Sequence, residues 1–295
     1  MTTLPLDAKD VFPEVPLVAL DTLWFQVAGT LCNLECTHCF ISSSPTNRSH
    51  GMLDLATVRR YLSEAAGLGV KEYYFTGGEP FLNPEILEIL EATLAQGPAT
   101  VLTNGVLIRP ETARRLRALA DASPYSLDLR ISLDGWDAAT NDPIRGEGTF
   151  DRILVGVRNL ADAGLVPVIT VTEACADAGT AGGRTRFLEF LRGIGLRQPR
   201  LKVLPLLRLG AETARTRGYA AWETLAGREL TREETEALQC SSCRMVTAKG
   251  VYVCPILIDF PDARMADRLA DTLRPFALRH RACHTCHEQG LTCRT

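Results

Sequence analysis

Three cysteines lie close together near the start of the chain, with the spacing C-x3-C-x2-C. They are Cys32, Cys36 and Cys39, and they follow a short apolar stretch that ends at Val27. Thiolates this close in sequence can converge on one metal centre, and three of them are one fewer than a closed iron–sulfur or zinc site requires. Such a centre keeps one coordination position open, where chemistry can take place.

A second group of cysteines lies near the other end of the chain. The sequence has no signal-peptide pattern and no apolar run long enough to span a membrane, so we expect a cytoplasmic protein with reduced thiols. Grouped cysteines in that compartment predict metal ligands rather than disulfides. The candidate metal ligands of both groups are Cys32, Cys36, Cys39, Cys240, Cys243, Cys254, Cys283, Cys286 and Cys293.

Composition argues against two classes of partner. The net charge is −3, and the basic residues are scattered rather than clustered. This balance gives no general attraction to nucleic acid or to an anionic membrane surface. We therefore expect neither as a partner.

From about residue 22 to 206, short apolar runs alternate with longer amphipathic segments. Six βα units in series imply parallel strands with right-handed crossovers, in an α/β sheet that is open or partly closed into a barrel. Asn83 is predicted to cap the helix after the second strand, and Thr231 a short helix near the C-terminus. The predicted strands cover residues 22–28, 72–76, 99–103, 127–133, 166–172 and 201–206.

Unusual residues follow these strands at the end where α/β folds bind ligands. The three-cysteine loop follows the first strand, and Asn104 follows the third. Apolar and polar residues alternate in the fourth strand, so Ser132 is predicted to point into the lumen. Cys175 follows the fifth strand; we interpret it as a small apolar packing residue, with hydrogen-atom donation to a substrate as the alternative.

The cysteine spacing, followed by residues 77–80 (GGEP) after the second strand, resembles the radical S-adenosylmethionine (radical SAM) superfamily. The resemblance continues in residues 103–105 (TNG), 131–135 (ISLDG) and 145–146 (RG). It implies a partial (β/α)6 TIM-type barrel over residues 22–206, after an N-terminal extension over residues 1–21. The residues that it assigns to SAM binding are Gly77, Gly78, Glu79, Pro80, Asn104 and Ser132.

The resemblance also implies the chemistry. In that superfamily three thiolates hold a [4Fe–4S] cluster that binds SAM, and reduction yields a 5′-deoxyadenosyl radical that abstracts a hydrogen atom from the substrate. It implies an oxidoreductase acting on a peptide or a small molecule, with an external electron donor such as flavodoxin or ferredoxin. The two glycines of the GGEP segment would let the backbone approach the ligand. A structural zinc with His38 as fourth ligand is the alternative for the first site.

Residues 207–295 resemble the auxiliary-cluster domains, called twitch or SPASM, of many radical SAM enzymes. Residues 250–254 are predicted to form a hairpin that returns Cys254 to the pair Cys240 and Cys243, with Cys283 and Cys286 completing a four-thiolate shell. We prefer one auxiliary [4Fe–4S] cluster; two clusters, or a structural zinc, are the alternatives. The other functional hypotheses are an enzyme similar to the molybdenum-cofactor cyclase, with substrate on an open auxiliary iron, and a non-catalytic metal-binding module.

Overall fold

A parallel sheet forms the centre of the molecule. The computed structural model describes residues 11–290. Its main sheet has nine strands in the order β10-β9-β8-β2-β3-β4-β5-β6-β7. The six strands predicted from the sequence are present in the predicted order and are mutually parallel, which confirms the series of βα units. They are β2 (Thr22–Gln26), β3 (Glu72–Thr76), β4 (Ala99–Thr103), β5 (Leu127–Ser132), β6 (Val168–Thr172) and β7 (Arg200–Leu204).

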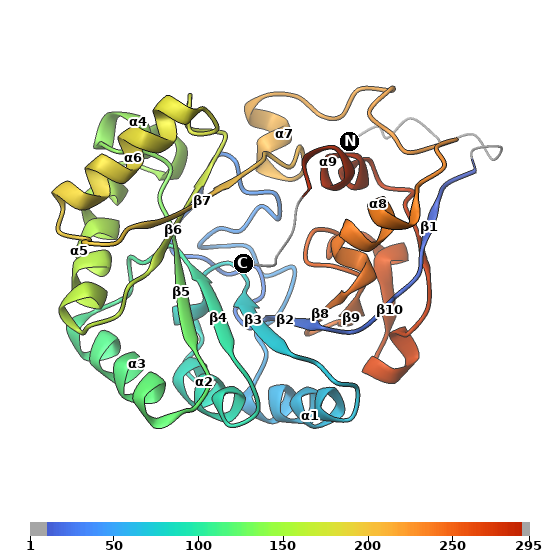
Figure 1. Ribbon diagram of the computed structural model, residues 1–295, viewed down its shortest axis with the longest axis horizontal. Helices are drawn as coiled ribbons and strands as arrows, with labels where there is room; N and C mark the ends of the chain where they lie inside the picture. Colours follow the sequence, from blue (N-terminus) through green and yellow to red (C-terminus); the bar gives the residue numbers. More distant parts are fainter. Residues whose placement is uncertain (1–10, 291–295) are drawn as a thin grey trace.

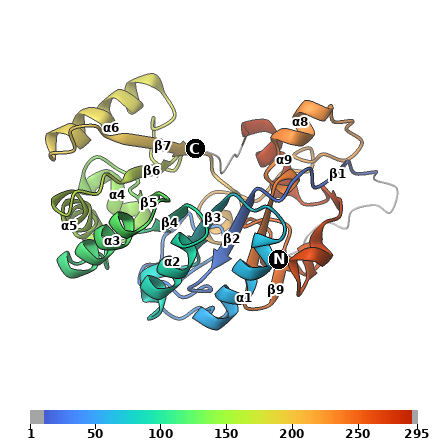
Figure 2. The same cartoon turned by 60° about the horizontal axis from the view of Figure 1, so that its bottom comes forward.

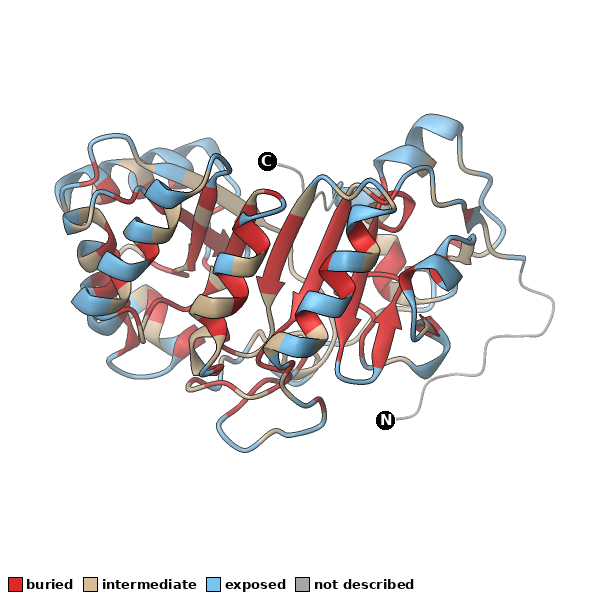
Figure 3. Cartoon of the chain, turned by 90° about the horizontal axis from the view of Figure 1, so that it is seen from below, coloured by how far each residue is buried: buried red, intermediate tan, exposed pale blue. Residues whose placement is uncertain are grey.

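The helices between these strands lie outside the curled sheet, in an arc that Figure 1 shows from α1 to α6. Buried residues concentrate in the strands and in the helix faces turned toward them (Figure 3). In α5, for example, Ile153, Val157 and Leu160 are buried at helical spacing. Because β10 and β7 are the sheet's two ends, the barrel is partial. The helices are α1 (Leu55–Ala66), α2 (Ile86–Leu94), α3 (Pro110–Ala122), α4 (Ala138–Arg145), α5 (Thr149–Asp162) and α6 (Ala181–Gly193).

One predicted helix cap lies just before the helix rather than at its N-cap position. A short 3-10 helix, η1 (Pro80–Leu82), follows β3, and α2 starts only at Ile86, with Glu85 at its N-cap position. Asn83 is buried; its Oδ1 accepts from the backbone N–H of Glu85 at 2.9 Å, and its amide donates hydrogen bonds of 2.8 Å to the carbonyls of Val27 and Leu53. The side chain therefore ties the end of β2 to the segment before α1, because two buried carbonyls at that point need a donor.

The C-terminal part continues the same sheet. Strand β8 (Cys243–Thr247) pairs parallel with β2, and β9 (Gly250–Tyr252) pairs antiparallel with β8, which confirms the predicted hairpin. Thr231 caps α8 with its hydroxyl, as predicted. The remaining elements are α7 (Ala211–Arg215), α8 (Arg232–Ala237), η2 (Gln239–Ser241), η3 (Pro261–Ala263), β10 (Arg264–Ala266), η4 (Leu269–Thr272), β11 (Phe276–Ala277) and α9 (Arg281–Gln289).

The segment before β2 packs on this C-terminal part. Strand β1 (Glu14–Val15) pairs antiparallel with β11, and the backbone N–H of Val18 donates to the carbonyl of Ser241 at 2.8 Å. Figure 2 shows β1 beside α8 and α9, away from the helices of the barrel. The division into residues 1–21, 22–206 and 207–295 stays a prediction. Among the described residues, no helix has the length and apolar character needed to cross a membrane.

Candidate metal-cluster sites

The first cysteine group lies at the carboxyl ends of the parallel strands, around a cavity of about 240 Å³. The cavity wall also includes apolar residues from the loop after β7, such as Leu206 and Leu207. Ser132 lines the cavity, as the alternation in β5 predicts. The other lining residues that the sequence singled out are Cys32, Cys36, His38, Cys39, Gly77, Gly78 and Asn104.

Each of the three thiols accepts a hydrogen bond from the surrounding chain. The backbone N–H of Leu34 donates to Cys32 Sγ at 3.4 Å, and that of Ser43 to Cys39 Sγ at 3.3 Å. Arg145 Nη1 lies 3.9 Å from Cys36 Sγ. Donors aimed at sulfur stabilise negative charge on it, as in thiolates that ligate iron.

Burial nevertheless opposes ionisation of these thiols. Loss of hydration raises the pKa of Cys32 to about 12, and the neighbouring thiols add to the effect. Burial also raises the pKa of Cys36, although the positive charge of Arg145 offsets part of the increase. Three thiolates in one buried place require positive charge between them, so the donor set fits an iron cluster.

The segment with the GGEP sequence fastens the cysteine loop. The N–H of Gly78 donates to the carbonyl of Gly29 at 2.8 Å, and that of Glu79 to the carbonyl of Leu31 at 3.0 Å. A Cβ atom on Gly78 would lie 2.0 Å from the Leu31 carbonyl oxygen. This glycine is therefore required for the contact between the two loops. The sequence alone did not reveal this reason for a glycine at position 78.

Glu79 lies behind the cavity wall rather than in it. Its side chain is fully buried; Oε1 accepts from Thr103 Oγ1 at 2.7 Å, and Oε2 accepts from the N–H of Asn104 at 2.8 Å. Pro80 is buried at the start of η1 and does not line the cavity either. Asn104 faces the cysteines, with Nδ2 3.7 Å from Cys32 Sγ.

A buried charge network, missed by the sequence analysis, supports the second cysteine. Asp134 Oδ2 lies 2.7 Å from Arg145 Nη2 and 2.8 Å from His38 Nε2, while Oδ1 accepts two hydrogen bonds of 2.7 Å from Thr172. Burial opposes ionisation of Asp134, but Arg145 and His38 outweigh it and hold the pKa of this carboxyl well below its ordinary value. The sequence feature that could have indicated this network is an arginine at the end of a helix, directly before Gly146.

This network also bears on the zinc alternative. His38 directs Nε2 to Asp134 rather than to the thiols. Between residues 11 and 290, no three cysteine, histidine, aspartate or glutamate side chains are placed to share a single metal ion. The contact with Asp134 directs His38 away from the role of fourth zinc ligand.

Cys175 does not reach the cavity. It is buried among Val171, Ala178 and Phe187, and its thiol donates to the carbonyl of Ala176 at 3.7 Å. Burial raises its pKa to about 11. These surroundings agree with the interpretation of Cys175 as a small apolar packing residue.

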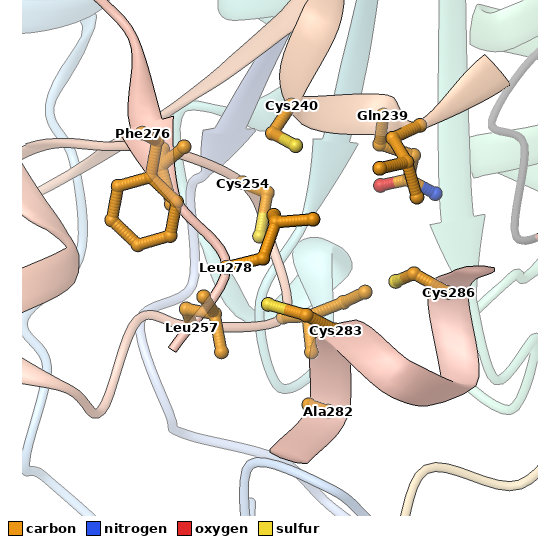
Figure 4. A pocket seen from close by; sticks show the side chains of 12 residues that line it. Gln239, Cys240, Cys254, Leu257, Phe276, Leu278, Ala282, Cys283 and Cys286 are labelled. Carbon is orange, nitrogen blue, oxygen red and sulfur yellow. The ribbon is translucent and has the colours of Figure 1, made fainter. Parts of the chain in front are cut away.

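The second cysteine group forms a separate pocket. Figure 4 shows Cys240, Cys254, Cys283 and Cys286 around one space that is otherwise lined mostly by apolar side chains. They come from η2, from the residues after β9, and from one face of α9. Burial raises the pKa of Cys240 to about 12 and that of Cys254 to about 11, so this pocket also requires positive charge to hold thiolates.

Of the other two cysteines of this group, only Cys243 is among the described residues. Cys243 does not line the pocket; it is the first residue of β8, and its thiol lies 4.0 Å from the carbonyl oxygen of Val253. Cys293 falls outside the described residues.

The two sites adjoin one continuous apolar cluster. Ile41, just beyond the first cysteine group, belongs to the same buried cluster as Cys240 and Cys254, and Cys39 packs against that cluster. The N–H of Ala211 donates to the Cys39 carbonyl at 2.9 Å, so the segment after the barrel docks on the first cysteine loop. Apolar side chains of one buried cluster therefore contact both thiol groups.

The fold is a partial barrel, and cysteine thiols gather at its mouth. This fold and these thiols support iron–sulfur chemistry as the class of activity. Residues 27–174, half of the chain, match the radical SAM superfamily, and the chain belongs to this family. Members of the superfamily are enzymes that use a [4Fe–4S] cluster and SAM.

Known proteins similar to this chain were found by sequence and by structure. Mycofactocin maturase MftC of Mycobacterium tuberculosis is 39% identical over 138 residues, which cover 46% of this chain and 34% of that protein. The AdoMet-dependent heme synthase of Methanosarcina barkeri is 35% identical over 142 residues, which cover 48% of this chain and 38% of that protein. The similarity thus spans little more than a third of the length of either relative.

A solved structure extends the comparison to most of the chain. Streptococcus suis SuiB bound to the precursor peptide SuiA superposes with a TM-score of 0.63 at 17% identity. The superposition covers 88% of this chain and 64% of SuiB. It shows that the two proteins share a fold.

Proposed function

We propose that this protein is a radical SAM oxidoreductase in which Cys32, Cys36 and Cys39 hold the SAM-binding [4Fe–4S] cluster. The observation that carries the proposal is the convergence of three hydrogen-bonded thiols on one cavity. When bound, the cluster and SAM supply a 5′-deoxyadenosyl radical that takes a hydrogen atom from the substrate.

The chain's own residues orient these groups and keep water out. The hydrogen bonds to sulfur stabilise the thiolates, and the buried pair of Asp134 and Arg145 keeps one cationic donor beside Cys36. Gly77, Gly78, Asn104 and Ser132 line the cavity and are our candidates for contact with SAM. Glu79 and Pro80 act behind them, by positioning the loops that carry Asn104 and Cys32.

We further propose one auxiliary [4Fe–4S] cluster held by Cys240, Cys254, Cys283 and Cys286. Four thiols around one pocket support a closed shell. The cyclase-like alternative, with an open auxiliary iron held by Cys240, Cys243 and Cys254, is less well supported because Cys243 does not line the pocket. A closed cluster fits a role in accepting the electron that remains on the substrate after hydrogen abstraction.

A peptide is the substrate class that the comparisons favour. One relative is a maturase, and one structure of similar fold contains a precursor peptide. An external reductant such as flavodoxin or ferredoxin would supply the first cluster with electrons. The proposed reaction is therefore oxidation of a peptide after hydrogen abstraction.

The proposal is tested by SAM cleavage. Anaerobically reconstituted protein, reduced with dithionite in the presence of SAM, should form 5′-deoxyadenosine, and the variant with Cys32, Cys36 and Cys39 all replaced by alanine should form none. Cys175→Ala is the matched control and should cleave SAM at the wild-type rate, because that thiol lies outside the cavity. Absence of 5′-deoxyadenosine from the fully loaded wild-type protein would contradict the proposed function.

Iron counting tests the auxiliary cluster. The wild-type protein should bind about eight irons per chain, and the variant with Cys283→Ala and Cys286→Ala about four. Cys243→Ala, the matched control, should keep about eight. A loss of iron in Cys243→Ala equal to that in the double variant would favour the ligand set of the cyclase-like alternative.

A further inference from the structure

A buried arginine on the inner face of β5 lines the cavity. Apolar and polar residues alternate along this strand: Leu129 and Ile131 are buried in the core under the helices, while Arg130 and Ser132 line the cavity. Arg130 pairs in register with Leu102 of β4 and Val168 of β6, so its guanidinium lies among the inward-facing residues of the barrel.

Among the described residues, no carboxylate forms an ion pair or a hydrogen bond with this arginine. It is 4% exposed, and its one hydrogen bond among the described residues runs from Nη2 to Tyr74 Oη at 3.3 Å. The guanidinium carbon lies 5.1 Å from the centre of the Tyr74 ring, and Nε is buried without a hydrogen-bond partner. Arg145, on the same cavity, is by contrast paired with Asp134.

The cavity offers no anion that could neutralise Arg130. None of the described residues that line it is an aspartate or a glutamate. The thiols at its mouth are already assigned to iron, and Arg145 lies beside them. An arginine kept buried without a counter-charge costs stability, so its place in the lumen suggests an anionic ligand.

Other polar groups in the lumen also lack partners. Thr170 lines the cavity, and its Oγ1 is buried without a hydrogen bond. Gln26, which pairs in register with the cavity residue Thr76, is fully buried with both side-chain polar atoms unsatisfied. Unsatisfied polar atoms at two positions of the cavity wall, Arg130 and Thr170, and at Gln26 beside the wall indicate a polar ligand rather than an apolar one.

We propose that the substrate carries a carboxylate, and that Arg130 binds it inside the barrel, with Thr170 and Gln26 as further hydrogen-bonding partners. This inference rests on the proposed function and adds the chemical class of the substrate. We favour a carboxylate over a phosphate for two reasons. The planar guanidinium can donate two parallel hydrogen bonds to a carboxylate, which carries the one negative charge that a single arginine neutralises. The second arginine of the cavity, Arg145, is already neutralised by Asp134. Arg130 would then fix the substrate relative to SAM.

The test compares anions with their neutral analogues on the reconstituted protein. Benzoate should raise the melting temperature, and benzamide should raise it far less, with an apparent affinity at least about tenfold weaker. Arg130→Met should abolish this preference, and Arg130→Gln serves as a second variant if the methionine variant does not fold. Arg115→Met, on the exposed face of α3, is the matched control and should keep the preference.

The outcomes separate this inference from the proposed function. An equal response to benzoate and benzamide in the wild-type protein, or a preference unchanged in both Arg130 variants, would overturn it. A stronger response to phenyl phosphate than to benzoate would overturn the choice of carboxylate. If the wild-type protein cleaves no SAM but the preference for benzoate depends on Arg130, the proposed function fails and the inference of an anion site is retained.

Acetylated dipeptides then identify the source of the carboxylate. One carries a free C-terminus, and the other is amidated and carries an aspartate side chain. A preference for either one over its fully neutral analogue supports the proposal and names the source, whereas no preference for either contradicts it.

Discussion

Three buried arginines of this protein are stabilised in three different ways. Arg145 is paired with Asp134, and Arg244, 1% exposed, donates to backbone carbonyls, among them those of Cys240 and Cys243 at 2.9 and 2.7 Å. Among the described residues, Arg130 contacts only a tyrosine hydroxyl and ring, and its Nε has no hydrogen-bond partner. A buried guanidinium that a carboxylate neutralises or that carbonyls satisfy belongs to the architecture of a site, and one that has neither and keeps an unsatisfied donor points to a ligand.

The pair of Asp134 and Arg145 should contribute strongly to stability. Asp134→Asn removes the charge that neutralises Arg145, so the free energy of unfolding should fall by about 3–5 kcal/mol. Asp128→Asn breaks the partly exposed pair between Asp128 of β5 and Arg200 of β7 and should cost at most about 1 kcal/mol. Chemical denaturation of the two variants at pH 7 measures the difference; equal losses would contradict the assignment of a buried charge network.

The raised thiol pKa values predict how cluster assembly depends on pH. Because the pKa of Cys32 is about 12 and that of Cys254 about 11, these thiols are protonated at neutral pH in the iron-free protein. Each must lose its proton when it binds iron, so iron affinity should rise as pH increases from about 7 to about 9. Anaerobic iron titrations at several pH values test this, and an affinity that is flat or falls with pH would contradict it.

At the scale of elements, apolar periodicity predicted the six parallel strands and their order. Some strands were predicted too long: β7 ends at Leu204, directly before Pro205, whereas the prediction extended the strand to residue 206. It did not predict that β8 pairs with β2, because the pairing of segments more than two hundred residues apart leaves no local signal. The sequence also contained no sign that Cys243 does not line the auxiliary pocket.

The contact between the GGEP segment and the cysteine loop makes a prediction about iron. Gly78→Ala places a Cβ 2.0 Å from the Leu31 carbonyl oxygen, so the cysteine loop must move. We expect the first site to lose its iron while the auxiliary site keeps about four irons per chain. Gly193→Ala, in α6, meets nothing within 4 Å and should keep the full iron content. Full iron content in Gly78→Ala would show that the loop contact is dispensable.

Arg244 joins three elements around the auxiliary pocket. From β8 it reaches the carbonyls of Cys240 in η2, at 2.9 Å, and Thr272 in η4, also at 2.9 Å. Arg244→Met removes the donor to the Cys240 carbonyl and leaves the Thr272 carbonyl with only the backbone N–H of Arg274, so the free energy of unfolding should fall by at least about 3 kcal/mol. The exposed ion pair of Arg232 with Glu236 provides the control, since Arg232→Met should cost at most about 0.5 kcal/mol. A small effect of Arg244→Met in denaturation would contradict this role.

At the scale of the whole molecule, the sheet joins both thiol groups into one structure. The parallel strands carry the cysteine loop, and β8 and β9 extend the sheet toward the auxiliary pocket. The spacing of the cysteines was enough to predict both sites, because metal ligands must be close in space and several are close in sequence. The network of Asp134, His38 and Arg145 was not predictable, because its members meet only when the ends of different elements converge.

The central claim is that Cys32, Cys36 and Cys39 hold a cluster with an open iron that SAM binds. Electron paramagnetic resonance of the reduced variant with Cys283→Ala and Cys286→Ala tests it most directly, because that variant should keep only this cluster. Addition of SAM should change the spectrum, as expected when the molecule binds an iron of the cluster. A spectrum that stays the same at saturating SAM, in protein that holds about four irons per chain, would contradict the claim.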